Sequence, residues 1–379
     1  MFLQRLFHLI ENTHISYNIK HYSHLLRSTY SNSYKVKMGE EPRRKKPFAK
    51  PVEKIGTHNG VFHCDEVVGC YLLKLLFPSA RIIRSRDDKV LKNCDIVIDV
   101  GGVYDPSTHR YDHHQRDFNH SISTVLKGKP WKTKLSSAGL VYCHFGIDII
   151  RTILGDKCEE DLLDPIFDKV YEGLIQEIDG VDNGVPMFEG EPRYHITTGL
   201  SSRVKNLNSN WNQKDFDEEL AFKKAMELAG SEFEDRVLYF SNVWWPARKF
   251  VLLAIKNRHI IDEGGEIMEL SQSVPWKEHY FSLENQLDIE PTIKYVIFPS
   301  DGVWRVQAVS VTEKSFVLRT PLHEKWRGLR DQQLSDISGI DGCIFAHGTG
   351  FIGGNKTREG AIEMARKSIE NFKKELSEK

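Results

Sequence analysis

Histidine and aspartate side chains concentrate in one short stretch of the chain, residues 57–115. This stretch contains the sequences Thr57-His58-Asn59-Gly60-Val61-Phe62-His63-Cys64-Asp65, Ile96-Val97-Ile98-Asp99 and Asp112-His113-His114. Imidazole nitrogens and carboxylate oxygens are together suitable ligands for divalent transition-metal ions. Two such ions held about 3.5–4 Å apart form the usual centre of metal-assisted phosphoester hydrolysis. The residue types therefore predict a two-metal hydrolytic site.

Each of these clusters follows a segment that the sequence predicts to be a β-strand. Residues 53–57 and 81–84 are short strand candidates, and the apolar run 94–100 is typical of a buried parallel strand. Acids at the start and a proline at the end predict a helix from Asp65 to Phe77. This alternation predicts an α/β domain with a mostly parallel sheet, with the clusters gathered at one sheet edge.

Two further acids, Asp179 and Asp182, follow a predicted helix. Either of them is able to complete the ligand shell of a second cation. Ordinary turn chemistry, in which Asp and Asn side chains bond to their own backbone, is the alternative.

The remaining chain predicts a second, smaller α/β domain. Helices are expected at residues 136–154, 159–178, 216–240 and 358–376, and strands at 250–255, 295–298 and 304–311. We expect Trp244-Trp245-Pro246 to end the long connecting helix. The predicted organisation is a targeting segment (1–50), a metal-binding domain with the connector helix (51–245) and a C-terminal substrate-binding domain (246–379).

A glycine-rich stretch, residues 346–357, precedes the last predicted helix. Backbone N–H groups of such a loop can approach a phosphate, and the helix start adds a favourable dipole. A plain surface turn is the alternative. The candidate substrate contacts are His347, Gly348, Gly350, Gly353, Gly354 and Lys356. Arg319, Arg327 and Arg330 near Trp326 are predicted either to line a nucleic-acid path or to form a solvated face.

Composition excludes several other classes of protein. The chain has 379 residues and a formal net charge of -1, so it is not a polycation that coats nucleic acid. Its 6 cysteines include no C-x-x-C pair, which favours a reducing compartment. We expect no membrane-spanning segment, because no apolar run is close to about 18 residues. The oligomeric state is left open.

The first fifty residues differ from the rest. Residues 1–37 are basic and contain one acid, Glu11, which is typical of a mitochondrial presequence, although an ordinary disordered tail is the alternative. The patch Pro42-Arg43-Arg44-Lys45-Lys46-Pro47 is typical of a nuclear-import signal. These segments predict localisation to the mitochondrion and the nucleus.

The order of the motifs resembles that of the DHH phosphoesterase superfamily, and three segments look like the melanocyte-proliferating-gene protein family within it. These segments are Thr57–Glu66, Tyr111-Asp112-His113-His114-Gln115 and Phe351-Ile352-Gly353-Gly354-Asn355-Lys356-Thr357. The resemblance covers residues 50–379 and implies an active site in the cleft between the two domains.

The resemblance also implies residue roles. It places His58, His63 and Asp99 on one manganese ion, and Asp65, Asp99, His113 and Asp179 on the other. His114 then faces the substrate, and His114 and Asp99 are the catalytic residues. The superfamily commonly has Asp where His63 stands. Zinc, iron or magnesium are the alternatives to manganese.

The resemblance implies a hydrolase, a 3′-to-5′ exoribonuclease that acts on RNA through two divalent cations and an activated water. One alternative is hydrolysis of a small phosphate compound, such as a short oligonucleotide, a cyclic dinucleotide or pyrophosphate. A second alternative is a non-catalytic binding protein stabilised by metal. The ligand set argues against this last class, because structural zinc sites are usually rich in cysteine.

Overall fold

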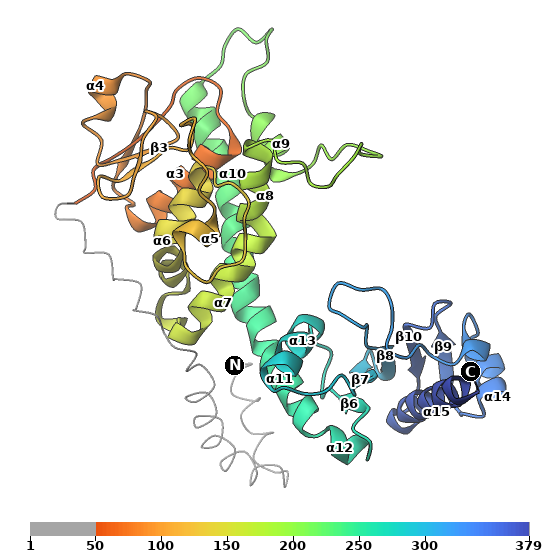
Figure 1. Cartoon of the computed structure of the whole chain (residues 1–379). Coiled ribbons are helices and arrows are strands. Elements are labelled where there is room, and N and C mark those ends of the chain that lie inside the picture. The colour runs from red at the N-terminus through yellow and green to blue at the C-terminus, as the bar shows by residue number, and fades with distance from the viewer. Residues whose placement is uncertain (1–50, 379) are drawn as a thin grey trace, which may run out of the picture. The chain divides into compact units, whose positions relative to one another are not determined.

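Two five-stranded sheets and their helices make up the part of the chain that this computed structural model describes, residues 51–378 (Figure 1). The predicted presequence and the basic patch at 42–47 lie outside the described residues.

The first sheet carries the predicted site. Its strands are β1 (Lys54–Thr57), β2 (Arg81–Arg84), β3 (Ile96–Ile98), β4 (Tyr104–Asp105) and β5 (Arg110–Tyr111). They lie in the order β2-β1-β3-β5-β4, and every neighbouring pair is parallel except β4 with β5. The predicted fold class, α/β with a mostly parallel sheet, is confirmed.

Helices connect and flank these strands. They are α3 (Cys64–Leu76), α4 (Asp88–Leu91), α5 (Ile122–Val125), α6 (Ser137–Leu154), η1 (Gly155–Lys157), α7 (Glu160–Val170), the π-helix η2 (Tyr171–Ile175), α8 (Gln176–Asp182), α9 (Leu200–Lys205) and α10 (Glu218–Tyr239). Helix α3 packs against α6 and α10, and it also contacts β1 and β3. The helices predicted at 136–154 and 159–178 are confirmed, the second as the continuous series α7-η2-α8.

Helix α6 is more apolar than the sequence pattern predicts. It has 18 residues and a mean hydropathy of 1.2, so by length and composition it is able to cross a membrane. Of this window, 67% is buried inside the protein, and α6 contacts α3, α7 and α8. A helix that is covered on most sides by protein is apolar for that reason. The expectation that the chain holds no such apolar helix is therefore corrected.

Helix α10 does not end at Trp244-Trp245-Pro246. It continues through the π-helix η3 (Phe240–Trp244) into α11 (Trp245–Lys256), so the strand predicted at 250–255 is wrong. Pro246 closely follows the π-helix, whose wider turn interrupts the regular i→i−4 hydrogen bonds at the point where proline has no N–H to donate. A short apolar run does not by itself distinguish a buried helix from a strand. The domain boundary predicted at residue 245 falls inside this helical stretch and stays a prediction.

The second sheet is formed by C-terminal residues. Its strands are β6 (Ile267–Glu269), β7 (Tyr295–Ser300), β8 (Val303–Ala308), β9 (Cys343–Ala346) and β10 (Ile352–Asn355), in the order β6-β7-β8-β10-β9. The helices of this part are α12 (Arg258–Ile261), α13 (Lys277–Gln286), η4 (Glu324–Trp326), α14 (Asp331–Ser338) and α15 (Arg358–Ser377). The strands predicted at 295–298 and 304–311 and the helix predicted at 358–376 are confirmed.

The two faces of this sheet belong to two apolar clusters. Along β7, Tyr295 and Ile297 pack with residues of α14 and α15, whereas Val296 and Phe298 pack with residues of α11 and α13. This alternation is the two-residue period of a strand with both faces covered.

Strand β10 corrects the prediction that residues 346–357 form a loop. Gly353 and Gly354 are buried in β10, which is hydrogen-bonded to β8 on one side and β9 on the other. A Cβ on Gly353 would lie 3.0 Å from the Leu322 side chain, and one on Gly354 would lie 2.8 Å from the Arg305 guanidinium. The two glycines thus let neighbouring side chains approach the strand closely.

Candidate metal centre

The predicted site residues follow three neighbouring strands. His58 follows β1, Asp99 follows β3, and Asp112 and His113 follow β5. Because β1, β3 and β5 are parallel neighbours, their carboxyl ends meet at one edge of the sheet. All four residues are buried. The structure therefore gathers these side chains where the strand pattern predicts them.

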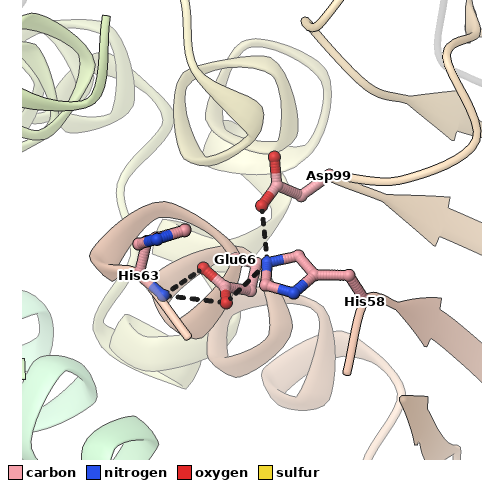
Figure 2. A group of neighbouring side chains, drawn as sticks. All are labelled: His58, His63, Glu66 and Asp99. Atoms are coloured by element: carbon pink, nitrogen blue, oxygen red, sulfur yellow. Dashed lines mark hydrogen bonds and ion pairs between the residues drawn. The ribbon is translucent and has the colours of Figure 1, made fainter. Parts of the chain in front are cut away.

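A first group of possible ligands consists of His58, His63, Glu66 and Asp99 (Figure 2). Nε2 of His58 lies 3.0 Å from Oε1 of Glu66 and 3.3 Å from Oδ2 of Asp99. One ligand atom from each of the four residues lies within 4.8 Å of the others. His63 is exposed, and its backbone N–H donates to both carboxylate oxygens of Glu66 at 2.9 Å.

Glu66 is the member of this group that the sequence pattern did not single out as a ligand. An acid in the first turn of a helix is already favourable there, because it complements the helix dipole. Yet Glu66 is completely buried, and a buried carboxylate is costly unless a cation or hydrogen bonds compensate it. The sequence feature that could have indicated Glu66 as a ligand is the pair of adjacent acids, Asp65 and Glu66, directly after a histidine-rich loop.

Asp99 lies between this group and a second one. Its Oδ2 faces His58, and its Oδ1 lies 3.4 Å from Nε2 of His113. Burial alone would raise the pKa of Asp99, but hydrogen bonds from His113 and His58 bring it below its usual range. The residue has a φ of 57°, and backbone strain of this kind concentrates at functional sites. Its position suits a carboxylate that bridges two cations.

The second group consists of Asp65, His113 and Asp182. Nε2 of His113 lies 3.2 Å from Oδ2 of Asp182 and 3.8 Å from Oδ2 of Asp65. Burial and the nearby charges of Asp99 and Asp182 raise the pKa of Asp65 well above its usual value. A cation between these acids would relieve their mutual repulsion.

Asp182, rather than Asp179, is the late acid that reaches this group. Oδ1 of Asp179 accepts hydrogen bonds from the Ser136 N–H at 2.9 Å and the Ser136 hydroxyl at 2.7 Å. Its Oδ2 accepts one from the Tyr171 hydroxyl at 3.1 Å. Both carboxylate oxygens are thereby satisfied, and no ligand group found among residues 51–378 includes Asp179. The structure brings Asp182, and not Asp179, to this group, while the assignment of either acid to a cation stays a prediction.

Unpartnered buried atoms test whether these residues fit a cation. Among residues 51–378, Oδ1 of Asp65 and Nδ1 of His113 are buried and lack a hydrogen-bond partner. A buried polar atom without a partner costs about 1–3 kcal/mol, which coordination would recover. Mixed nitrogen and oxygen donors suit Mn²⁺, Zn²⁺ or Fe²⁺ better than Mg²⁺, which prefers oxygen. Among residues 51–378, Asp99 also forms a third possible ligand group with His113 and His114, so it belongs to two of the three groups, and His113 connects it to Asp65 and Asp182.

The acids around His58 also favour a positive charge at this position. Burial disfavours its imidazolium form, but hydrogen bonds and charges from Asp99 and Glu66 raise the pKa of His58 to about 10. Without metal, a proton on His58 therefore supplies the charge that the two acids require.

His114, like His63, is exposed, whereas most residues of the site are buried. Its side chain is 61% exposed, and its Nδ1 lies 2.7 Å from Oδ1 of Asp112. The hydrogen bond to Asp112 raises the pKa of His114. Asp112 is held by N–H groups of Gly102 and His114. His114 therefore lies on the exposed side of the ligand groups, and its predicted contact with substrate stays a prediction.

The predicted substrate contacts of the second sheet have different environments. His347 and Gly348 are exposed in the turn between β9 and β10, and Lys356 is exposed directly after β10. Gly350 is buried with a φ of 73°, and a Cβ there would lie 2.9 Å from Arg327. The substrate-binding roles of these residues, and the expected cleft, stay predictions.

Of the three arginines near Trp326, only Arg330 is exposed. The Arg319 side chain is 8% exposed and forms an ion pair with Glu284, and the half-buried Arg327 donates from Nε to the Leu322 carbonyl at 3.0 Å. Arg319 is therefore excluded from the predicted nucleic-acid path.

The fold and the site define an α/β protein with adjoining His and carboxylate groups at the carboxyl edge of a parallel sheet, the arrangement of a metal-dependent hydrolase. The model of the family MYG1_exonuc, described as an uncharacterised protein family (UPF0160), matches residues 54–369. The chain belongs to this MYG1 family. This membership confirms the predicted family and, with it, the predicted class of enzyme.

Curated relatives are similar over nearly their whole length. The MYG1 exonuclease of Mus musculus is 49% identical over 354 residues, which are 91% of this chain and 93% of the relative. That of Homo sapiens is 49% identical over 333 residues, 86% of this chain and 89% of the relative. The MYG1 protein YER156C of Saccharomyces cerevisiae is 40% identical over 339 residues, 86% of this chain and 98% of the relative.

Solved structures are more distant. The structure of RecJ in complex with Mn²⁺ from Thermus thermophilus is 12% identical, with a TM-score of 0.22, and the match covers 84% of this chain and 52% of that one. A similarity this low supports no conclusion about this chain.

We expect the substitution Asp182→Asn to lower the affinity for Mn²⁺ at least about tenfold, since the uncharged amide is a poorer ligand beside His113. The affinity is measured by titrating metal-free protein with Mn²⁺ and following free Mn²⁺ by electron paramagnetic resonance. Asp148→Asn, an exposed acid on α6, is the control. Wild-type affinity in Asp182→Asn would remove this residue from the ligand set.

Proposed function

We propose that this protein is a metal-dependent exonuclease that hydrolyses phosphodiester bonds of RNA from the 3′ end, using two divalent cations. The observation that carries the proposal is the buried carboxylate of Asp99, which two groups of possible ligands share. The relatives named exonuclease, at about half identity over most of the chain, support the nuclease class.

When bound, two cations supply an activated water and neutralise charge on the phosphoryl oxygens. The chain itself holds the ligand carboxylates in a buried cluster, which strengthens their interaction with charge. His114 presents an imidazole, whose pKa is raised by its hydrogen bond to Asp112, on the exposed side of the cluster, where it is able to contact a phosphoryl oxygen or give a proton to the leaving oxygen. Asp112 orients that ring.

A second observation favours a nucleic-acid substrate over pyrophosphate. On the second sheet, the guanidinium groups of Arg305 and Arg330 lie 5.3 and 5.8 Å from the centre of the Phe345 ring. Gly354 pairs with Arg305 on one side and Phe345 on the other in the register of the sheet, and both side chains lie close over it. Arginine and aromatic side chains together can contact phosphates and stack on bases.

We expect the double substitution Arg305→Ala with Arg330→Ala to raise the KM for single-stranded RNA at least about tenfold, because two contacts to the strand are lost. The kcat for bis-p-nitrophenyl phosphate should stay within about twofold, since this small diester occupies the metal site alone. Arg366→Ala, an exposed arginine on α15, is the control. An unchanged KM for RNA would exclude this face as a contact surface.

The metal and the compartments are also part of the proposal. Mn²⁺ is supported by the mixed imidazole and carboxylate ligand set. Residence in the mitochondrion and the nucleus is supported by the composition of residues 1–37 and the basic patch 42–47. A choice of RNA over DNA rests on the family resemblance.

The proposal is tested by a substrate panel of RNA, DNA, dinucleotides and pyrophosphate with Mn²⁺, in which each nucleic acid is labelled at one end. Hydrolysis from the 3′ end releases a mononucleotide at once from 3′-labelled RNA and a shortening ladder from 5′-labelled RNA. Asp99→Asn protein, purified in the same way, is the control for contaminating nucleases.

Activity on pyrophosphate or dinucleotides without activity on longer strands would instead identify a hydrolase of small phosphate compounds. Absence of hydrolysis with any divalent metal, together with tight metal binding, would identify a binding protein stabilised by metal.

A further inference from the structure

The first residue of helix α6 contacts one acid from each ligand group. The backbone N–H of Ser137 donates to Oδ2 of Asp65 at 3.3 Å, and its hydroxyl donates to Oδ1 of Asp99 at 3.1 Å. Ser137 is completely buried. The N-terminus of a helix carries partial positive charge, so the direction of α6 adds to the effect of these hydrogen bonds.

The preceding residue, Ser136, caps this helix and is itself held by Asp179. Its hydroxyl accepts from the Gly139 N–H at 3.5 Å and donates to Oδ1 of Asp179 at 2.7 Å. The Ser136 N–H donates to the same oxygen, and Tyr171 holds Oδ2. A Cβ on residue 139 would lie 2.3 Å from Oδ1 of Asp179, so glycine is required there for the carboxylate to approach.

We infer that Asp179 and Ser137 are positioning residues of the metal centre. Asp179 fixes the start of α6 through Ser136, and Ser137 at that start holds one oxygen each of Asp65 and Asp99. The other oxygen of Asp65 then has no partner within the protein, and that of Asp99 faces His58. The inference rests on the proposed function, because it requires that the centre binds divalent cations.

This arrangement has a direct consequence for metal affinity. A carboxylate that is free to rotate must be ordered when the metal binds, whereas Ser137 orders two carboxylates in advance. Loss of a hydrogen bond that orients a metal ligand typically costs about 10–100-fold in metal affinity. We therefore expect Ser137→Ala to weaken Mn²⁺ binding about tenfold, and Ser137→Thr, which keeps the hydroxyl, to restore it to within about threefold of wild type.

The experiment titrates metal-free protein with Mn²⁺ and follows free Mn²⁺ by electron paramagnetic resonance, without substrate. Ser368→Ala is the matched control, because Ser368 is likewise a buried helical serine, with its hydroxyl bonded to the Met364 carbonyl. At saturating Mn²⁺ the kcat of Ser137→Ala should return to within about threefold of wild type, which distinguishes lost affinity from lost catalysis. Wild-type affinity in Ser137→Ala would overturn the inference.

Ser136→Ala and Asp179→Asn test the indirect role of Asp179. If Asp179 acts through the helix start, Ser136→Ala should weaken Mn²⁺ binding as Asp179→Asn does, although Asp179 itself is intact. Loss of metal in Asp179→Asn with normal affinity in Ser136→Ala would instead show a direct ligand and overturn the inference. If Asp179→Asn does not fold, the Mn²⁺ affinities of Ser136→Ala and Ser137→Ala test the inference.

Failure of the inference and failure of the proposed function have different signatures. A protein that binds Mn²⁺ but hydrolyses no phosphodiester contradicts the function and leaves the affinity comparison valid. An active nuclease whose Mn²⁺ affinity is unaffected by Ser137→Ala contradicts the inference alone.

Discussion

Asp99→Asn is expected to lower phosphodiesterase activity at least about 10³-fold, which corresponds to about 4 kcal/mol of transition-state stabilisation. The carboxylate of Asp99 lies 3.3 Å from His58 and 3.4 Å from His113, so the substitution removes a charged donor from the first ligand group and from the group that Asp99 forms with His113 and His114. The measurement is kcat/KM on single-stranded RNA and on bis-p-nitrophenyl phosphate with Mn²⁺. Both substrates should be affected equally, because the lesion is at the centre itself.

Asparagine is the suitable replacement because residue 99 has a φ of 57°, which Asn tolerates better than most residues. Asp288→Asn is the matched control, an exposed aspartate with a φ of 50° outside the site. If Asp99→Asn kept most of the Mn²⁺-dependent activity, the catalytic assignment of this cluster would be wrong.

Arg319→Ala is expected to lower the free energy of unfolding by about 3–5 kcal/mol, because it leaves the charge of Glu284 buried and unpaired. Nη1 and Nη2 of Arg319 each lie 2.7 Å from an oxygen of Glu284, and Nη1 also donates to the Tyr280 hydroxyl at 2.7 Å. The pair links α13 to the segment after β8. Urea denaturation followed by circular dichroism measures the effect.

The double substitution Arg319→Met with Glu284→Met provides the test of this reason. It removes both charges and keeps most of the buried volume, so it should be less destabilising than Arg319→Ala alone. Arg248→Ala is the control, since Arg248 makes hydrogen bonds to α13 that are exposed. Equal destabilisation in the double variant would assign the effect to packing instead of to the unpaired charge.

Much of the candidate site could be predicted because it is encoded locally. His58, Asp99 and His113 each follow closely on a short strand, of which only the one before Asp99 is an apolar run, and parallel neighbouring strands end at the same sheet edge. The strand pattern is a property of a few successive residues, and the sheet edge follows from the general geometry of α/β folds. Their gathering therefore needed no knowledge of long-range packing.

Local sequence patterns could not predict that Glu66 belongs to a candidate ligand group, nor could they distinguish Asp179 from Asp182. All three are acids on helices, and both interpretations of each are locally reasonable: an acid near a helix end is common with or without a metal. What distinguishes them is burial and the neighbours that arrive from distant segments. Ser136 donates a hydrogen bond to Asp179, which is 43 residues away in the chain, and His113 contacts Asp182 at the sheet edge.

The errors in the second half of the chain have a related cause. Residues 250–255 are an apolar run that fits a strand or a buried helix equally well. They are helical in the structure because α10 continues through η3 into α11. Gly353 and Gly354 fit a phosphate-binding loop in sequence. In the structure they lie in a strand, where Leu322 and Arg305 pack too closely for a larger residue.

By itself, the sequence determined the α/β class, the elements around the first sheet and the chemistry of the ligands, because periodicity and residue type are local properties. The tertiary structure alone decided which acids lie in the candidate ligand groups and which hold the helices that surround them. That distinction depends on burial: within a desolvated cluster, an acid is compensated either by donors, as Asp179 is by Ser136 and Tyr171, or by a cation, as Asp65 requires.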